Sequence, residues 1–159
     1  MLRYIPGALV LLISLQCSAD LRVNSPSEAC TLLTDSHLRA GEWSKAQGGR
    51  EGCQSTARLL NVKNSSMISF SVDGIDNKPL KVRLLLDVAS ADDVDPAKRE
   101  LVKATKRLAV RALGLSIPFP VEESIMKGTP IRLTLGLGTL TITRTANIKG
   151  GYQMAVVME

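Results

Sequence analysis

Aromatic residues are scarce in this chain, and their scarcity bears on the kinds of ligand it can bind. They make up 3% of its 159 residues, as two Phe, two Tyr and one Trp. Proteins that bind carbohydrate or single-stranded nucleic acid usually stack the ligand on several aromatic rings. The composition therefore disfavours both of these classes of binding protein.

Histidine and cysteine are also rare, with one His and three Cys in the whole sequence. A zinc site built from Cys and His alone would need all four residues, and the spacing of Cys17, Cys30, His37 and Cys53 matches no such site. The sequence also lacks a C-x-x-C, a G-x-S-x-G and a Walker motif. We therefore predict no metal, no cofactor and no catalytic residue, and expect a protein that is not an enzyme.

No apolar run in the sequence is long enough to span a bilayer, but a short one lies near its start. Residues 8–15 are apolar except for Ser14, follow Arg3, and lead to a small residue at Ala19. This pattern predicts a signal peptide over residues 1–19 and a single exported domain over residues 20–159, periplasmic or secreted. The alternative is a lipoprotein anchored at Cys17, although Gln16 stands where that processing prefers a small residue.

Two cysteines remain after such a cleavage, Cys30 and Cys53. An even number of cysteines in an exported chain predicts a disulfide. A redox role is the alternative, but redox pairs usually occur as C-x-x-C. We therefore expect a structural cross-link between Cys30 and Cys53.

The segment between these cysteines is rich in glycine and poor in apolar residues. Residues 39–53 contain four Gly, and Trp43 is their one large apolar side chain. Glycine raises the entropic cost of ordering such a loop, which explains the need for a cross-link. Trp43 has two interpretations: the favoured one packs it onto the core, and the other exposes it as an anchor for a binding partner.

The rest of the chain alternates between helical and extended patterns. A capping box at Ser25 and Glu28 predicts a first helix that ends before Gly41. The other expected elements are a short helix over 54–60, strands over 66–72 and 80–88, a helix from Asp95 to about 113, a short helix over 121–127, and strands over 131–135, 140–144 and 152–158. This order, α-ββ-α-βββ, predicts an α+β two-layer sandwich with two to three helices on an antiparallel sheet of about five strands.

The helix expected from Asp95 to about 113 carries six cations, more positive charge than the net charge of the whole chain. The chain has a net charge of +5, and without Arg3 it is +4. Such a run is usually a solvated helix face, but it also fits a docking surface for an acidic protein, or for anionic lipid or envelope polymer. The candidate contact residues on this helix are Lys98, Arg99, Lys103, Lys106, Arg107 and Arg111.

The layout resembles that of small exported bacterial proteins of unknown function. The resemblance rests on residues 25–30, 41–43, 52–53 and 71–74 and on the basic helix. It implies no activity, and it agrees with export, one disulfide and the absence of a catalytic pattern. The resulting hypothesis is a non-enzymatic envelope protein that binds another protein through the basic helix or Trp43; the alternative is a binder of anionic lipid or envelope polymer through the basic helix.

Overall fold

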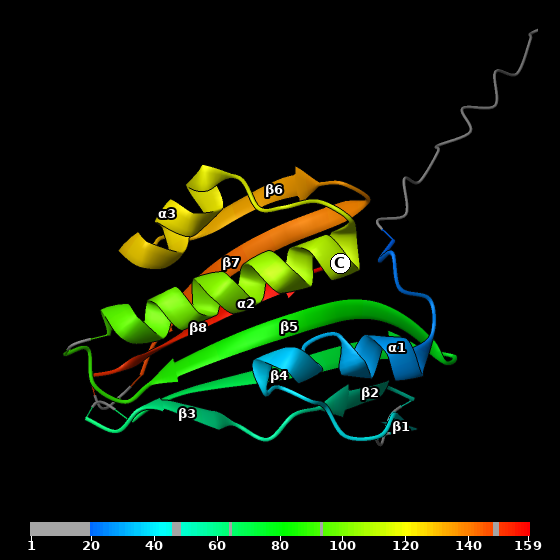
Figure 1. The fold of residues 1–159 in the computed structure, drawn as a ribbon, viewed down its shortest axis with the longest axis horizontal. Helices are drawn as coiled ribbons and strands as arrows, with labels where there is room; N and C mark the ends of the chain where they lie inside the picture. Colours follow the sequence, from blue (N-terminus) through cyan, green and yellow to red (C-terminus); the bar gives the residue numbers. More distant parts are fainter. Residues whose placement is uncertain (1–19, 46–48, 64, 93, 148–149) are drawn as a thin grey trace, which may run out of the picture.

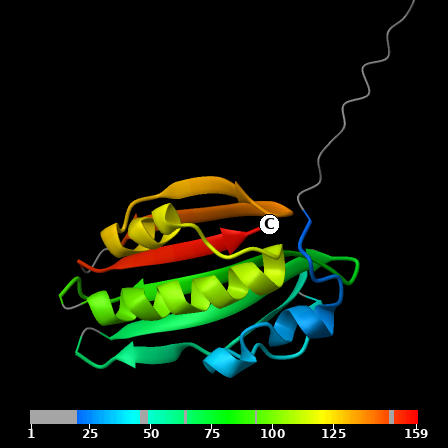
Figure 2. The ribbon, with the colours of Figure 1, turned by 45° about the horizontal axis from the view of Figure 1, so that its top comes forward.

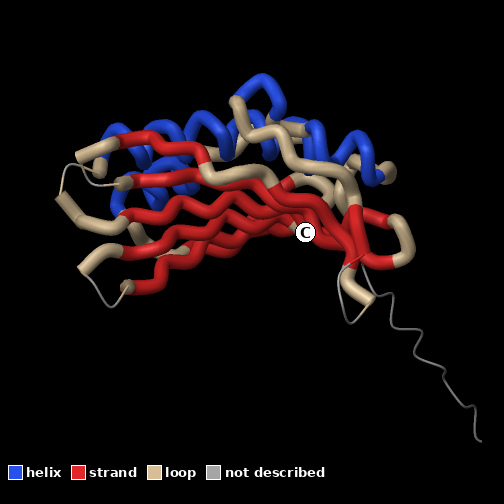
Figure 3. Tube along the Cα trace, turned by 90° about the horizontal axis from the view of Figure 1, so that it is seen from below, coloured by secondary structure: helices blue, strands red, loops and turns tan. Residues whose placement is uncertain are grey.

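Strands form one antiparallel sheet, and the helices lie on one face of that sheet. The computed structural model describes residues 20–45, 49–63, 65–92, 94–147 and 150–159, so the predicted signal peptide, including Cys17 and Ala19, lies outside the described residues. The two layers are separate when the sheet is viewed along its edge (Figure 3). The predicted α+β class and antiparallel sheet are therefore confirmed.

The sheet is larger than expected, because the described residues form eight strands rather than about five. Their order is β1-β2-β4-β5-β8-β7-β6, and β3 pairs with β4 as well (Figure 1). Their bounds are β1 Ser44–Lys45, β2 Glu51–Gln54, β3 Arg58–Asn61, β4 Ser66–Ile75, β5 Lys78–Val88, β6 Ile131–Leu135, β7 Gly138–Ala146 and β8 Tyr152–Met158.

The long strands follow directly from alternating apolar residues. In β4 the residues Ile68, Phe70 and Val72 are buried, while the residues between them face the side of the sheet that carries no helix. Asp76 and Asn77 connect β4 to β5 with positive φ angles of 52° and 58°. Asp and Asn tolerate this left-handed conformation, which two-residue hairpin turns require.

The additional strands β1, β2 and β3 lie in the region expected to be a loop and a short helix. The helix expected over 54–60 is absent: Gln54 ends β2 and Arg58 begins β3. Both β2 and β3 pair with one edge of the ten-residue β4. Their backbone groups form hydrogen bonds with that edge, and this tertiary pairing overrides the weak local preference for a helix.

Three α-helices of the described residues cover one face of the sheet (Figure 2). They are α1 Pro26–Thr31, α2 Asp95–Leu113 and α3 Phe119–Lys127, and a 3-10 turn, η1 Thr34–Ser36, follows α1. Ser25 caps α1 as expected, because its Oγ accepts a hydrogen bond from the Glu28 N–H at 3.3 Å. α2 begins at Asp95 as expected, and Val94 is its N-cap.

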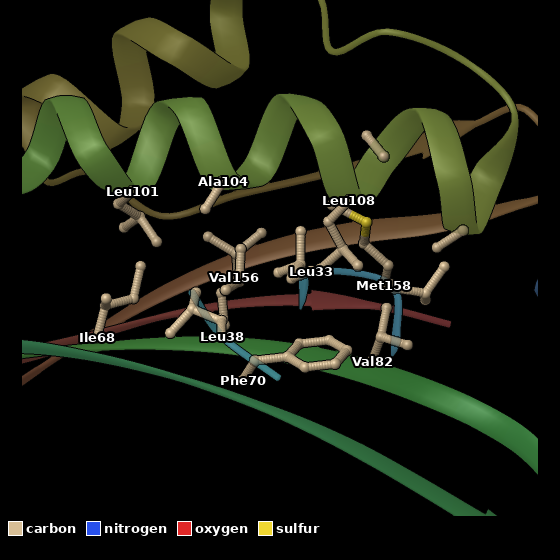
Figure 4. Packing of buried hydrophobic residues seen from close by; sticks show 14 of the residues in the cluster. Leu33, Leu38, Ile68, Phe70, Val82, Leu101, Ala104, Leu108, Val156 and Met158 are labelled. Carbon is tan, nitrogen blue, oxygen red and sulfur yellow. The ribbon is translucent and has the colours of Figure 1, made fainter. Parts of the chain in front are cut away.

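The core lies between α2 and the covered face of the sheet (Figure 4). Leu101 and Leu108 of α2 are fully buried and face side chains from the central strands. Val156 and Phe70 are fully buried opposite them. Within the described residues, no helix is long and apolar enough to cross a membrane.

The predicted disulfide is present and joins α1 to β2. Cys30 and Cys53 are 23 residues apart in sequence, their Cα atoms are 6.0 Å apart, and both side chains are buried. The bond encloses η1 and β1. It therefore holds the shortest helix and the edge of the sheet against the core.

Removing this disulfide should destabilise the protein substantially. A disulfide that closes a loop of this length lowers the entropy of the unfolded chain, which stabilises the fold by about 3 kcal/mol. We expect the double variant Cys30→Ala, Cys53→Ala to lose about that much free energy of unfolding, measured by urea denaturation. Equal stability in the variant and the oxidised wild type would show that the bond does not support the fold.

Candidate functional site

The two cations of α2 nearest α3 contact that helix. Lys98 donates a hydrogen bond from Nζ to the Met126 carbonyl at 2.8 Å, at the end of α3. Lys106 forms an ion pair with Glu122, with 2.7 Å between Nζ and Oε1. These side chains join α2 to α3, so their charges are engaged within the protein.

The two arginines near the end of α2 contact the segment around η1. Arg107 donates to Ser36 Oγ at 2.9 Å. Arg111 forms a two-pronged ion pair with Asp35, with both N···O distances 2.8 Å, and also donates to the Leu32 carbonyl. Planar pairs of this kind are the stronger form of ion pair. The hydrogen bond from Arg111 lowers the pKa of Asp35 to about 2.

The two remaining cations, Lys103 and Arg99, are exposed to solvent. Lys103 pairs with Glu100 at 2.7 Å, and Arg58 of β3 approaches the same carboxylate at 3.6 Å. Both contacts lower the pKa of Glu100, the hydrogen bond from Lys103 most of all. Arg99 is exposed and forms no ion pair within the described residues. The predicted basic surface is therefore largely balanced by acids of its own helical layer.

The Arg111–Asp35 pair has a measurable signature. We expect Arg111→Gln to raise the pKa of Asp35 from about 2 toward the ordinary Asp value of about 3.8, as followed by carboxyl carbon NMR. The folded pKa lies below the unfolded value, so the pair stabilises the fold above about pH 4. That contribution disappears as the pH falls toward 2.

The control is Arg99→Gln, which removes a cation of the same helix that has no ion pair in the described part of the chain, and it should leave the Asp35 pKa unchanged. Because both members of the Arg111–Asp35 pair are partly exposed, its effect on stability at neutral pH should be small. An Asp35 carboxyl that still titrates near 2 in Arg111→Gln would contradict the assignment.

A second set of contacts surrounds Glu51, a buried acid on β2. Glu51 is 5% exposed. Its Oε2 accepts hydrogen bonds from the backbone N–H of Asn77 at 2.6 Å and from Nε1 of Trp43 at 3.1 Å. Lys45 approaches Oε1 at 3.2 Å. These groups favour the carboxylate form and lower the pKa of Glu51, with the Asn77 N–H the largest cause.

The fold brings these groups together from three separate segments. Lys45 is opposite Glu51 in the β1–β2 pair, and Asn77 belongs to the turn between β4 and β5. Trp43 packs against the core beside Gly74, where an added Cβ would clash with the Lys78 carbonyl oxygen and lie 2.7 Å from the Cη2 atom of the indole. Glycine at this position therefore leaves room for the ring.

Trp43 also forms part of a groove between α1 and the segment that leads into β1. The groove has a volume of about 680 Å³, compared with about 540 Å³ for a second groove over β2, β4 and β5. Its lining residues are Pro26, Ser27, Cys30, Thr31, Arg39, Ala40, Gly41, Glu42, Trp43 and Asn77. The tryptophan thus packs onto the core, as the favoured interpretation expects, and also borders a surface that a partner can reach.

The groove is lined mainly by apolar surface. Its charged residues, Arg39 and Glu42, are exposed and of opposite sign. Among the described residues, no group of three or more His, Cys, Asp or Glu side chains is placed to hold a metal ion. Apolar lining with a few polar groups is found both in ligand pockets and in protein interfaces.

Sequence reasoning identified Trp43 and Cys30 but missed Glu51 and Asn77. Glu51 lies in a polar, glycine-rich stretch where an acid is usually exposed. One signal in the sequence could have found Glu51. The N–H of a Trp that packs onto a core needs an acceptor, and the loop that contains the one Trp also contains carboxylates. Asn77 is distant in sequence and contributes only its backbone.

The chain matches no protein-family model, and no similar curated protein or solved structure was found. The likeness to exported bacterial proteins therefore stays a prediction, and function has to be argued from the site itself.

The lone tryptophan allows the role of Glu51 to be measured. We expect Glu51→Ala to shift Trp43 fluorescence to longer wavelength at neutral pH, since the indole loses its acceptor and becomes more exposed. In the wild type the same shift should appear in acid. The folded pKa of Glu51 is below the ordinary value of about 4.5, so its stabilising contribution is present above that pH and lost as the pH falls through the folded value.

Glu51→Gln retains an oxygen acceptor but cannot titrate, so its emission should not show the acid-dependent shift. Glu42→Ala, at an exposed position in the same groove, is the matched control and should keep the wild-type emission. Identical spectra for Glu51→Ala and the wild type would show that Glu51 does not position the indole.

Proposed function

We propose that this chain is a non-enzymatic, exported protein-interaction module that binds a partner protein in the groove beside Trp43. One observation carries the proposal: a buried, hydrogen-bonded Glu51 holds the single Trp of the chain at the border of an open groove. An indole held in one position loses little freedom on binding, and Trp is among the residues that contribute most to protein interfaces.

The disulfide supports the same proposal in two ways. Cys30 lines the groove, and its bond to Cys53 ties α1 to β2. On the other side of the groove, the Gly41 N–H donates to the Gln54 carbonyl of β2 at 3.0 Å, so both sides are held to the same strand. A groove with restrained sides needs little rearrangement when a partner enters it. Disulfides persist in oxidising compartments, which is compatible with export.

The partner chemistry follows from the groove. The lining is mainly apolar, and the exposed Arg39 and Glu42 carry opposite charges. We therefore expect an extended segment of a protein that inserts an apolar side chain against Trp43 and presents polar groups of both signs to the rim.

Docking through α2 is the second candidate, and it takes an acidic protein or anionic lipid as the partner. It is favoured by Phe119, at the start of α3, which is 73% exposed, and by Val110 of α2, which is 44% exposed. Exposed apolar side chains beside cations are typical of surfaces that bind anionic lipid. The internal pairing of α2 cations such as Lys106 and Arg111 weakens this candidate, because a partner would have to compete with Glu122 and Asp35.

Blocking the groove tests the proposal. Ser27 is an exposed α1 residue that lines it. A photo-crosslinking amino acid at Ser27 would identify a partner in the native envelope fraction, and titration with that purified partner would then be followed by Trp43 fluorescence and calorimetry. We expect Ser27→Trp to weaken binding at least tenfold, because the added ring fills the groove, while Ser27→Ala binds like the wild type.

The double variant Lys103→Glu, Arg107→Glu separates the two candidates. It should bind normally if the groove is the site. Loss of binding in this variant, with unchanged binding in Ser27→Trp, would overturn the groove and place the partner on α2. Circular dichroism of each variant checks that the fold is retained.

A further inference from the structure

The outer edge of β6 carries backbone groups that have no partner within the described residues. Thr139 exchanges both backbone hydrogen bonds with Glu159, at 2.6 and 3.1 Å, so its N–H and C=O point toward β8. Because these directions alternate along a strand, the N–H and C=O of Leu140 point toward β6, where Leu140 is opposite Leu133. Leu133 therefore uses its backbone groups on β7, and those of Arg132 and Thr134 point away from the sheet.

The turn between β6 and β7 leads to the same assignment. Leu135 is opposite Gly138, and two residues connect them, beginning with Gly136 at a φ of 62°. In such two-residue hairpins the closing pair exchanges hydrogen bonds. The backbone N–H and C=O of Leu135 therefore point toward β7, as those of Leu133 do. The backbone groups of Thr134, between them, point away from the sheet.

This edge has little of the protection that sheet edges usually carry. β6 is five residues long, has no register shift against β7, and contains no Pro and a single charge, Arg132. The opposite side of the sheet is different: β1 is two residues long, and β3 has a register shift between Leu59 and Asn61. Short or irregular strands prevent pairing with another chain, whereas a regular edge strand permits it.

The apolar side of β6 is also incompletely covered. Ile131 and Leu133 pack against the core from the outermost strand, but both remain only partly buried. β6 lies at the outer border of the sheet (Figure 2). A strand added at this edge would cover the exposed flanks of both side chains.

We propose that β6 pairs antiparallel with β6 of a second copy of this chain, around a two-fold axis at Leu133. The five residues alternate apolar and polar, so the strand matches itself when reversed. Leu133 then faces Leu133 of the partner subunit, and Ile131 faces Leu135 of the partner subunit. The new pairs continue the apolar layer across the interface.

Charge and hydrogen bonding agree with this register. Arg132 faces Thr134 of the partner subunit, so no cation is directly opposite another cation. The backbone groups of Arg132 and Thr134 are those that point outward, so each of the two symmetric pairs forms both of its hydrogen bonds. An isologous contact of this type closes on itself as a dimer. This favours a second copy over an unrelated strand.

The register makes Thr134 the position that decides the strength of the dimer. Thr134 is exposed, so its replacement leaves the core intact. Thr134→Lys places a cation opposite Arg132 of the partner subunit and should weaken dimerisation about tenfold. Thr134→Glu places a carboxylate there and should strengthen it by a similar factor, since the effect occurs twice in a symmetric interface. Both shifts should shrink in high salt.

Sedimentation velocity over a range of protein concentrations measures these effects. Thr143→Lys and Thr143→Glu are the matched controls, because Thr143 is an exposed residue of β7 away from the β6 edge, and neither should change the dimer. A second variant, Arg132→Pro, removes an outward N–H without removing a bond of the β6–β7 ladder, and it should give a monomer.

Two results would overturn the proposal. One is a wild-type protein that remains monomeric at the highest concentrations. The other is a dimer with the same dissociation constant in Thr134→Lys and Thr134→Glu. The Trp43 groove lies near the β1 side of the sheet, opposite β6 in the strand order, so failure of the dimer would leave binding in the groove untouched.

Discussion

The contact between α2 and the covered face of the sheet organises the rest of this structure. Because helices lie on one face only, every apolar side chain that must leave water has to meet this single layer. Leu101 and Leu108 point into it from α2, and Phe70 and Val156 point into it from the strands. This contact fixes the rotation of α2 about its axis and directs its charged residues to the flanks.

The flanks of α2 are occupied by the other helical segments. Glu122 of α3 lies on one side and Asp35 of η1 on the other, and each pairs with a cation of α2. The ion pairs therefore follow from the packing: once the apolar stripe faces the sheet, the cations have these acids as neighbours. A run of positive charge in a helix sequence thus need not create a positive surface, because the tertiary fold decides which acids stand beside it.

The elements predicted from sequence are those whose pattern repeats over many residues. Alternation over 66–72 and 80–88 predicted β4 and β5, and the helical period from Asp95 to about 113 predicted α2. The short strands β1, β2 and β3 were missed because two to four residues carry too little pattern. β2 and β3 form on the edge of β4, and β1 forms on β2. The predicted number of strands was therefore too small, and the missing strands all lie on the β4 side of the sheet.

The site was only partly predictable for a related reason. Trp43 and the disulfide are recognisable from residue type, because one Trp in a polar loop and two Cys that remain after the predicted signal peptide are unusual on their own. The burial of Glu51 depends on the β4–β5 turn, and the pairing of Arg111 joins residues 76 positions apart. Contacts of such separation are set by topology, about which local composition carries no information.

The place of β8 in the sheet has a consequence for how the molecule is assembled. β8 is the last strand in sequence, yet it lies between β5 and β7. It joins the group of β1 to β5 to the pair of β6 and β7. Hairpins β4–β5 and β6–β7 can form from neighbouring residues, but the sheet becomes continuous only when β8 enters between them. Folding during synthesis would therefore stop at two separate halves, and the slow step should be the closure of a long loop.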